Sequence, residues 1–440
     1  MSRTTLRQVL RQFGPRIGLA WQPKSLPNTS IRGAFGLFFS PLEYSVYNHT
    51  ADINPFSPTY NFSGTTTQYI PLQDPYSYVN SGAPGGVNPF PPFASANQNP
   101  SASSTFPAGP LSIAAIFSRD FKLGTTQSWN LSLEQQFGNN FALHLAYVGS
   151  ESYHQNIPID ANPGIYNASN APISGSRITY TNFGQILQNT SVGTASYNSL
   201  QAGIEKRISH NLQFQSNFTW SRTEDTFSNA SLSFSGSLAN PFNLRFNYGN
   251  SDLNVPFISV TNFVYTTPGL SGHNIFLKQV LGAWEVSGIY TMQSGSPFGI
   301  SGGNGNNNSA SQQGGDRADF APDYSATTGS LGIRQGSRTQ QLAKYFNTAA
   351  FTVNAPGTFG NTPRNLFQGP GINTADLGLM KNWAYREHYK LQFRWEMFNA
   401  FNRPDFANPN NDPSSGNFGQ ITTIGPIAPR VMQAALKLTF

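Results

Sequence analysis

The sequence predicts an all-β protein: an antiparallel up-and-down transmembrane β-barrel, of which the chain forms the C-terminal portion of about eleven strands, with short periplasmic turns and long extracellular loops. Three observations lead to this prediction. They are the pattern of the last residues, the composition of the chain, and the alternation of short and long connections between strand-like segments.

The end of the chain has the pattern of a strand with one apolar face. Along 431–440 every second residue is apolar, and the residues between them, apart from Val431, are small or polar. The apolar positions are Met432, Ala434, Leu436, Leu438 and Phe440. A period of two that runs to a terminal aromatic residue is typical of the last strand of an outer-membrane barrel, which faces lipid and closes against the first strand. We therefore predict that these residues mark a barrel-closing strand.

The composition favours one large barrel over several soluble domains. Charged residues make up only 10% of the 440 residues, against roughly a quarter in ordinary globular proteins, yet the mean hydropathy is -0.35. Uncharged polar residues have therefore replaced the charges, and 35 Phe and 18 Tyr supply strand-forming aromatics. The net charge of +6 is scattered without a basic run, so we expect no nucleic-acid partner. The absence of cysteine excludes disulfides, and no apolar run reaches the ~18 residues of a membrane-spanning helix.

Segments of roughly 8 to 14 residues with a two-residue period recur along the chain. In order, we predict strands at 15–22, 29–40, 126–137, 141–150, 198–208, 211–222, 256–267, 279–293, 374–384, 389–402 and 429–440. The connections are short at 23–28, very long at 41–125, tight at 138–140, long at 151–197, tight at 209–210, long at 223–255, moderate at 268–278, very long at 294–373, tight at 385–388 and long at 403–428. In an antiparallel meander this alternation places every tight turn at one end and every long loop at the other, as in transmembrane barrels.

The well-patterned strands separate apolar from polar side chains. In 129–137, Trp129 and Leu131 share one face, whereas Asn130 and Glu134 share the other. Because a charge facing lipid costs about 2–4 kcal/mol at the midplane, the charged faces should line the lumen. The lumen-facing candidates are Arg32, Glu134, His144, Glu205, Arg207, Arg394 and Glu396. The aromatic residues predicted to form girdles at the lipid interface are Trp21, Trp129, Tyr147, Trp220 and Tyr290.

No motif in the chain indicates catalysis or metal binding. A GxSxG match at 299–303 lacks the helix that must follow a nucleophile elbow, and the next residues, GNGNNNS, predict a flexible extracellular loop. This loop lacks the aspartates of a calcium site, and the six histidines lack metal-ligand spacing. We therefore expect no enzyme activity, no metal and no cofactor.

The first residues do not look like the start of an exported protein. Residues 1–20 contain four arginines but no apolar segment of a secretory signal peptide. Since an outer-membrane chain needs such a signal, we expect this chain to be the C-terminal piece of a longer protein.

Several segments resemble the β-barrel of TonB-dependent receptors, specifically the Oar-like group common in Acidobacteria. The matching segments are FGPRIGLAW (13–21), IRGAFGLFF (31–39), YNSLQAGIEKRISHNLQFQSNFTWS (197–221), GAWEVSGIYTMQSGSPF (282–298), PGTFGNTPRNLFQGPG (356–371), LQFRWEMFNAFNRPDFANPN (391–410) and the closing FGQITT and PRVMQAALKLTF. The resemblance covers nearly the whole chain apart from about the first ten residues and parts of the long loops.

The resemblance implies that 1–440 is a partial receptor barrel without the signal peptide, the plug or the carboxypeptidase-regulatory-like domain of this group. In such receptors a barrel of about 22 strands encloses the plug. The receptor takes up a large or scarce nutrient, energised by the inner-membrane TonB complex. The implied partners are outer-membrane lipid, the missing plug and N-terminal half of the barrel, the TonB complex and the barrel-assembly machinery.

Two alternatives remain open at the level of sequence. One is a porin-like or adhesin barrel in the outer membrane. The other is a secreted β-sandwich that acts as a binding module or enzyme, which would be water-soluble and would bury its apolar faces.

Overall fold

The computed structural model describes residues 12–41, 73–74, 111–168, 176–177, 180, 183–228, 238–272, 274–303, 305, 307–311, 313–324, 331–332, 336–385, 389–425 and 427–440. Within this part of the chain, no helix is long and apolar enough to cross a membrane.

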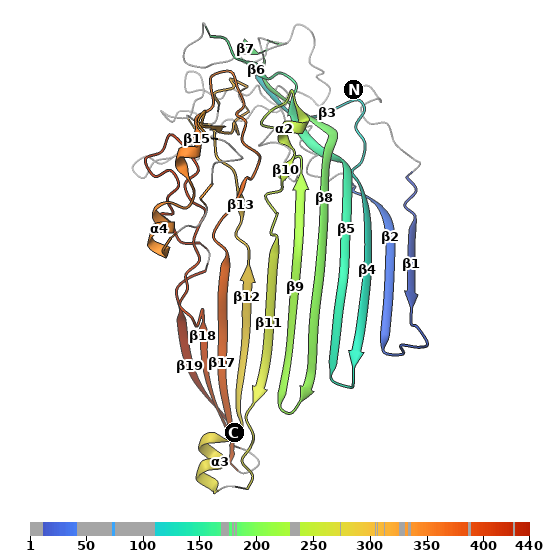
Figure 1. Ribbon diagram of the computed structural model, residues 1–440, viewed down its shortest axis with the longest axis vertical. Coiled ribbons are helices and arrows are strands. Elements are labelled where there is room, and N and C mark those ends of the chain that lie inside the picture. Colours follow the sequence, from blue (N-terminus) through green and yellow to red (C-terminus); the bar gives the residue numbers. More distant parts are fainter. Residues whose placement is uncertain are drawn as a thin grey trace.

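Eleven antiparallel strands form the main path of a 13-stranded sheet, and their order across the sheet is their order along the chain (Figure 1). They are β1 (Arg16–Trp21), β2 (Thr29–Phe39), β4 (Thr125–Phe137), β5 (Phe141–Asp160), β8 (Phe183–Ser209), β9 (Leu212–Asp225), β11 (Phe257–Thr266), β12 (Trp284–Gln293), β17 (Ile372–Tyr385), β18 (Tyr389–Phe398) and β19 (Val431–Thr439). Each overlaps one predicted strand. In the described residues the path begins at β1 and ends at β19 without pairing of these two strands, so the sheet is open.

The ends of the sheet differ as the connection lengths predict. The tight turns lie together at the lower end in Figure 1, and the long loops rise from the upper end. His210 and Asn211 join β8 to β9 with φ angles of 51° and 61°, a left-handed pair that matches the twist of a two-residue hairpin. The up-and-down topology and the grouping of the tight turns at one end of the sheet are therefore confirmed.

Four predicted boundaries are wrong. The segment predicted as a strand from 279 begins instead with helix α3 (Ile275–Leu281), because the Asn274 side chain caps the Leu277 N–H at 2.9 Å and starts a helical turn. The strand predicted to reach 402 ends at Phe398, since Asn399 and Asn402 adopt φ angles of 48° and 52°. β5 continues to Asp160 and β8 already begins at Phe183, so both strands are longer than predicted. Their additional residues also pair with each other, as far as Asp160 with Leu187.

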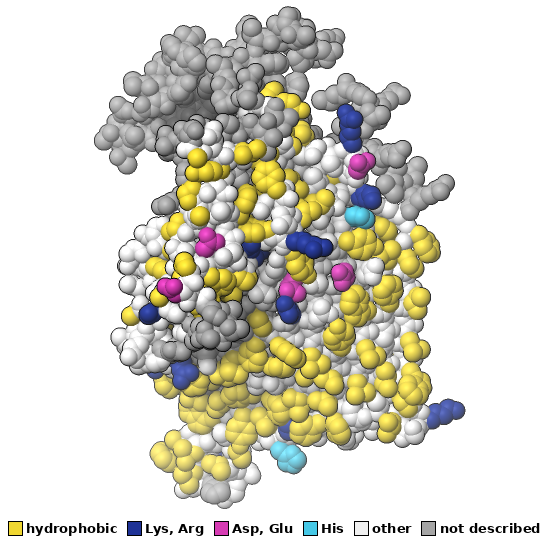
Figure 2. Space-filling model, turned by 45° about the horizontal axis from the view of Figure 1, so that its top comes forward, with side chains coloured by type: hydrophobic (Ala, Val, Ile, Leu, Met, Phe, Trp, Pro, Cys, Tyr) yellow, Lys and Arg dark blue, Asp and Glu magenta, His cyan; other side chains and the backbone are white. Residues whose placement is uncertain are grey.

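The register confirms the two-faced sheet. Leu133 pairs with Leu145, and Leu391 pairs with Leu438, so the apolar side chains of neighbouring strands share one face. Leu131, Leu145 and Leu438 are 59%, 41% and 59% exposed. In Figure 2, hydrophobic side chains gather over the lower part of the visible face. A β-sandwich would bury these side chains against a second sheet, so that alternative is wrong.

The compact hydrophobic core lies in the loops. We call the described residues of 294–371 the loop cap. Its core consists of Phe298, Ile300, Ala318, Tyr345, Phe346, Ala350, Phe351 and Phe367. Around it lie the strand pairs β13 (Pro297–Phe298) with β16 (Phe367–Gln368) and β14 (Asp319–Phe320) with β15 (Phe351–Thr352), helix α4 (Arg338–Ala343) and the 3-10 turn η4 (Thr348–Ala350).

The prediction of a flexible loop at 302–308 is wrong at the two ends of this segment. Asn308 is 5% exposed, and its side-chain amide donates to the Asn354 carbonyl oxygen at 3.0 Å. A Cβ added to Gly302 would lie 2.5 Å from the Asn354 side chain. Both ends are therefore packed against the rest of the cap, whereas Gly305 between them is exposed.

Shorter elements extend the sheet among the other long loops. β3 (Leu111–Phe117) runs parallel to β8, and β10 (Gly249–Asn250) pairs with β9 after helix α2 (Leu244–Asn247). A further pair joins β6 (Gly164–Ile165) to β7 (Ser176–Arg177).

Candidate functional site

Four of the predicted lumen-facing residues meet on the polar face of β2, β4, β5 and β8. The Arg32 guanidinium lies 3.5 Å from the Glu134 carboxylate, and His144 Nδ1 lies 3.8 Å from the same oxygen. Glu205 lines the same hollow of about 630 Å³. Glu134 and His144 pair directly within the β4–β5 hairpin, and the register of β2 and β8 brings Arg32 and Glu205 beside them from two other hairpins.

The charges of this polar-face cluster are solvated. The side chains of Arg32, Glu134 and His144 are 56%, 42% and 43% exposed. Exposed ion pairs of this kind contribute about 0–1 kcal/mol to the stability of the folded protein, so these side chains can exchange partners at little cost in free energy. The arrangement suits a wall that meets another polar surface or a passing solute.

The other three lumen candidates lie apart from the hollow. The guanidinium of Arg207 comes within 4.0 Å of Glu205, toward the tight-turn end. Arg394 and Glu396 lie on β18, near the opposite edge of the sheet, where Arg394 Nε donates to Gln392 Oε1 at 2.5 Å and Glu396 accepts from Gln433. The sequence predicted one polar face. In the structure the charged residues of that face form two groups, one on β2 to β8 and one on β18.

The predicted girdle aromatics share the apolar face. Trp129 faces Phe35 and Gly149, and Trp220 faces Leu200. A Cβ on Gly149 would lie 2.4 Å from the Trp129 ring, so the glycine makes room for the indole. Tyr290 pairs with Ala375 on this face, and Trp21 lies at the tight-turn end of β1.

One of these aromatics has a polar anchor. Tyr147 of β5 donates its hydroxyl to Asn198 Oδ1 of β8 at 2.6 Å. An aromatic side chain with an apolar body and an anchored polar tip suits the membrane–water interface. Their role as girdles remains a prediction.

Sequence reasoning missed a second aromatic group at the tight-turn end. Trp284 pairs with Lys381, and Trp383 pairs with Leu391, which places all four on the apolar face. The Lys381 ammonium lies 5.4 Å and 5.7 Å from the centres of the two indole rings and donates to the Gly282 carbonyl oxygen. The position of Trp383 beside the turn predicted at 385–388 was the signal that could have revealed this group.

The predicted closing strand has the expected face. Met432, Ala434, Leu436 and Leu438 pair in turn with Met397, Trp395, Phe393 and Leu391 of β18. Phe440 follows the strand and is 89% exposed. The outer edge of β19 is unpaired in the described residues. The strand against which β19 closes therefore remains a prediction.

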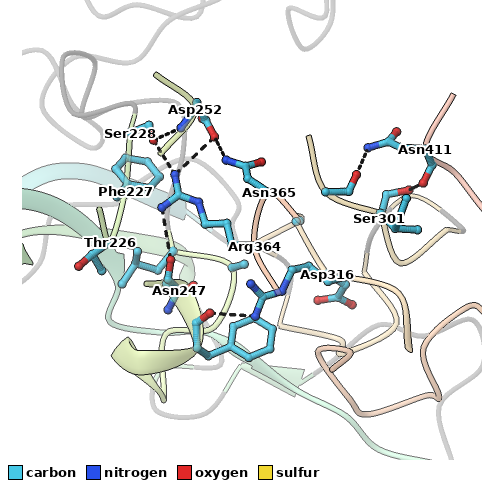
Figure 3. Close-up of a pocket in the computed structure, with 18 residues that line it drawn as sticks. Thr226, Phe227, Ser228, Asn247, Asp252, Ser301, Asp316, Arg364, Asn365 and Asn411 are labelled. Atoms are coloured by element: carbon cyan, nitrogen blue, oxygen red, sulfur yellow. Dashed lines mark hydrogen bonds and ion pairs between the residues drawn. The ribbon is translucent and has the colours of Figure 1, made fainter. Parts of the chain in front are cut away.

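Arg364 joins the loop cap to the loop after β9 (Figure 3). Its Nη1 lies 2.5 Å from Asp225 Oδ1 and 2.8 Å from the Asp225 carbonyl oxygen, while Nη2 donates to Ser228 Oγ at 2.6 Å. Asp252 completes the network at 3.4 Å. The side chains of Arg364 and Asp225 are only 17% and 10% exposed, so this ion pair is shielded from water.

Beside it lies a hollow of about 310 Å³ lined by residues of several loops, including Arg317, Asp316 and Ser301. The Arg317 guanidinium stacks 3.7 Å from the centre of the Phe246 ring, and burial together with the charge of Arg364 lowers its pKa to about 10. Burial also raises the pKa of the Asp316 carboxyl, although two hydrogen bonds from Ser309 oppose that shift.

The GxSxG serine has no nucleophile geometry. Ser301 Oγ donates to the Asn411 carbonyl oxygen at 3.2 Å, and Ser301 forms an isolated bridge with Arg317, not a strand-to-helix elbow. In the described residues, no three His, Cys, Asp or Glu side chains gather as metal ligands would.

A single antiparallel meander with one apolar face, one charged face, tight turns at one end and long loops at the other defines the wall of a transmembrane β-barrel. The sequence matches the family model "Outer membrane beta barrel domain" over residues 1–433. The chain belongs to this family, and its location is the outer membrane.

The chain is also similar to solved structures of larger proteins. The chain is similar to the outer membrane transporter YddB from Escherichia coli (10% identity, 97% of this chain, 40% of that chain, TM-score 0.46). It is similar to the FrpB iron transporter from Neisseria meningitidis (13% identity, 97% of this chain, 39% of that chain, TM-score 0.40). It is also similar to the siderophore receptor PirA from Acinetobacter baumannii (10% identity, 97% of this chain, 41% of that chain, TM-score 0.41). The chain spans about two fifths of each of these proteins. A search of curated protein sequences found no match.

Proposed function

We propose that this chain is the C-terminal part of the barrel of a TonB-dependent receptor, which takes up a large or scarce nutrient across the outer membrane with energy supplied through the inner-membrane TonB complex. The observation that carries the proposal is the open eleven-strand sheet with a charged inner face. In lipid, each unpaired backbone group of an edge strand costs several kcal/mol, so the edges of β1 and β19, which are unpaired in the described residues, need partner strands. About eleven more would complete the 22-stranded barrel of plugged transporters.

The polar-face cluster fits the inner wall of such a receptor. Arg32, Glu134, His144 and Glu205 offer both signs of charge in one solvated hollow. A plug domain that fills the lumen needs polar partners on the wall that can be released when the plug moves, and weak exposed ion pairs supply them. The missing plug and N-terminal half of the barrel are thus the expected partners of this face.

We infer no catalytic role for the chain. The hydroxyl of Ser301 is engaged with a loop carbonyl, and the structures to which the chain is similar are transporters and receptors. The barrel-assembly machinery is the expected partner of the last strand, whose apolar alternation ends at Phe440.

Two measurements on the protein encoded by the complete reading frame test the proposal. The first is whether the DNA upstream of the Met1 codon continues the frame into a plug and a TonB box. The second is whether the purified receptor binds the periplasmic domain of TonB and stays electrically silent in a planar bilayer. A steady open-channel current with no TonB binding would contradict the proposal in favour of a porin-like barrel.

A further inference from the structure

Helix α3 exposes an apolar surface at the tight-turn end of the sheet. Ile275, Phe276, Val280 and Leu281 are 70%, 71%, 43% and 57% exposed. The connection that carries α3 spans 267–283, whereas the turns at 138–140 and 210–211 are tight. In Figure 1 the helix protrudes below the strands, and in Figure 2 hydrophobic side chains also gather there. This much exposed apolar surface on one short helix indicates an interaction site for a membrane or another protein.

Two indoles fix α3 on the apolar side of the sheet. Trp383 Nε1 donates to the Gln279 carbonyl oxygen at 3.0 Å, and Trp284 Nε1 donates to the Val280 carbonyl oxygen at 2.7 Å. Both tryptophans lie on the face that carries Leu391 and Leu438, opposite to the charged face. The helix is therefore continuous with the lipid-facing band and lies away from the lumen side, where a plug would lie.

The same hydrogen bonds satisfy backbone groups that a lipid environment would leave without partners. The last carbonyl oxygens of a helix have no intrahelical donor. In α3 the two indoles donate hydrogen bonds to the carbonyl oxygens of Gln279 and Val280. The Gly282 N–H donates to the Lys278 carbonyl oxygen at 3.2 Å. The Lys381 ammonium serves the carbonyl oxygen of Gly282 itself. Such satisfaction is what permits a helix end to enter an interface poor in water.

The charges around α3 complement phospholipid headgroups. The segment 267–283 contains Lys278 and His273 but no Asp or Glu. Along the helix, Phe276, Leu277, Val280 and Leu281 fall on one side, and Lys278 and Gln279 fall on the other side together with Ile275. An apolar face beside a basic one is the pattern of a helix that lies in the plane of an anionic membrane surface.

We propose that α3 is an interfacial helix that inserts its apolar face into the inner leaflet of the outer membrane, with Lys278 directed to the lipid phosphates. It anchors the β11–β12 hairpin at the periplasmic membrane surface. The proposal depends on the outer-membrane location of the chain and not on the transported nutrient.

The lack of cysteine in the sequence allows a clean depth measurement. A Phe276→Cys variant is labelled with an environment-sensitive fluorophore and reconstituted into vesicles of phosphatidylethanolamine and phosphatidylglycerol that contain lipids with a nitroxide on the acyl chain. Leu131→Cys, in the lipid-facing band, is the positive control, and Lys24→Cys, in the exposed β1–β2 turn, is the negative control. Heat-modifiable gel mobility confirms that each variant is folded.

We expect lipid quenching at position 276 to reach at least about half of that at position 131, because the label lies at the headgroup–acyl boundary. No quenching above the Lys24→Cys level would overturn the proposal. A label that is shielded from a water-soluble maleimide but not quenched by lipid would also overturn it, since a periplasmic protein or a second copy of the chain would then cover the helix.

The charge of Lys278 is tested separately. Adding Lys278→Glu to the Phe276→Cys variant should lower the lipid quenching by about twofold or more in vesicles with phosphatidylglycerol, because one basic residue near an anionic surface adds measurable affinity. Vesicles in which phosphatidylcholine replaces phosphatidylglycerol should show a smaller difference. An equal loss in both lipids would refute the phosphate contact.

Discussion

Arg364→Ala should release the loop cap from the loop that follows β9. The guanidinium makes three contacts at 2.8 Å or less with Asp225 and Ser228, and both members of the ion pair are shielded from water. Removing one partner of a buried pair costs about 3–5 kcal/mol, because the remaining charge stays buried without compensation. Taking the lower figure, local opening should become roughly a hundredfold more frequent.

The matched control is Arg222→Ala. Arg222 lies on the same strand end as Asp225 and forms an ion pair with Glu224 at 2.7 Å, but its side chain is 70% exposed. An exposed pair contributes at most about 1 kcal/mol, so its loss should leave the loops closed. A double variant, Arg364→Ala with Asp225→Ala, should recover part of the protection because it removes the stranded carboxylate.

Hydrogen–deuterium exchange of the folded protein in detergent measures these changes. Peptides covering 226–252 and 359–368 should exchange faster in Arg364→Ala, while peptides within β9 should not change, because the loops open locally. If Arg364→Ala and Arg222→Ala give the same exchange in the loops, the ion pair does not hold the cap and the reasoning from burial fails.

Three further outcomes follow from the two faces and from the cap. Leu131→Arg should reduce the heat-modifiable folded fraction at a cost of about 2–4 kcal/mol, whereas Ser132→Arg, on the opposite face, should have little effect; equal losses would contradict the lipid-facing assignment. Gly149→Ala should destabilise the barrel in urea by about 1–3 kcal/mol, because the added Cβ would meet the Trp129 ring at 2.4 Å, and unchanged stability would show that the ring moves freely. Burial raises the pKa of Asp316 above 3.8, so its contribution to cap stability is fully present below pH 3.8 and is lost as the pH rises through the raised pKa. Amide exchange in the cap, corrected for intrinsic rates, should therefore show more protection at acidic pH than at neutral pH, and Asp316→Asn should lack this step.

The hairpins illustrate what local pattern can predict. The Leu391–Leu438 and Phe393–Leu436 pairs lie on one face, as the two-residue period requires, because successive side chains of a strand point to opposite faces. In chain order, the alternation of turn lengths was sufficient to place each strand beside the next. Where apolar residues did not alternate, as in Ile275–Leu281, the pattern did not separate helix from strand, and a cap at Asn274 decided it.

The candidate sites show the opposite case. Residue type and face identified Arg32, Glu134 and His144 as polar wall residues. Glu134 and His144 meet across the tight turn at 138–140, but only the register of β2 against β4 brought Arg32 to Glu134. Arg364 was not recognised at all, since its partner Asp225 lies 139 residues earlier in the chain and neither carries a motif.

The sequence by itself determined the number and order of the eleven strands, their apolar and polar faces, and the end at which each turn lies. These properties follow from side-chain alternation and from connection length, which are local. Only the tertiary structure decided that residues of the loops 294–371 and 403–428 pack around Phe346, that Arg364 ties the loop cap to the end of β9, and that α3 lies on the apolar side of the sheet. Those features depend on contacts between distant segments, whose geometry no local period specifies.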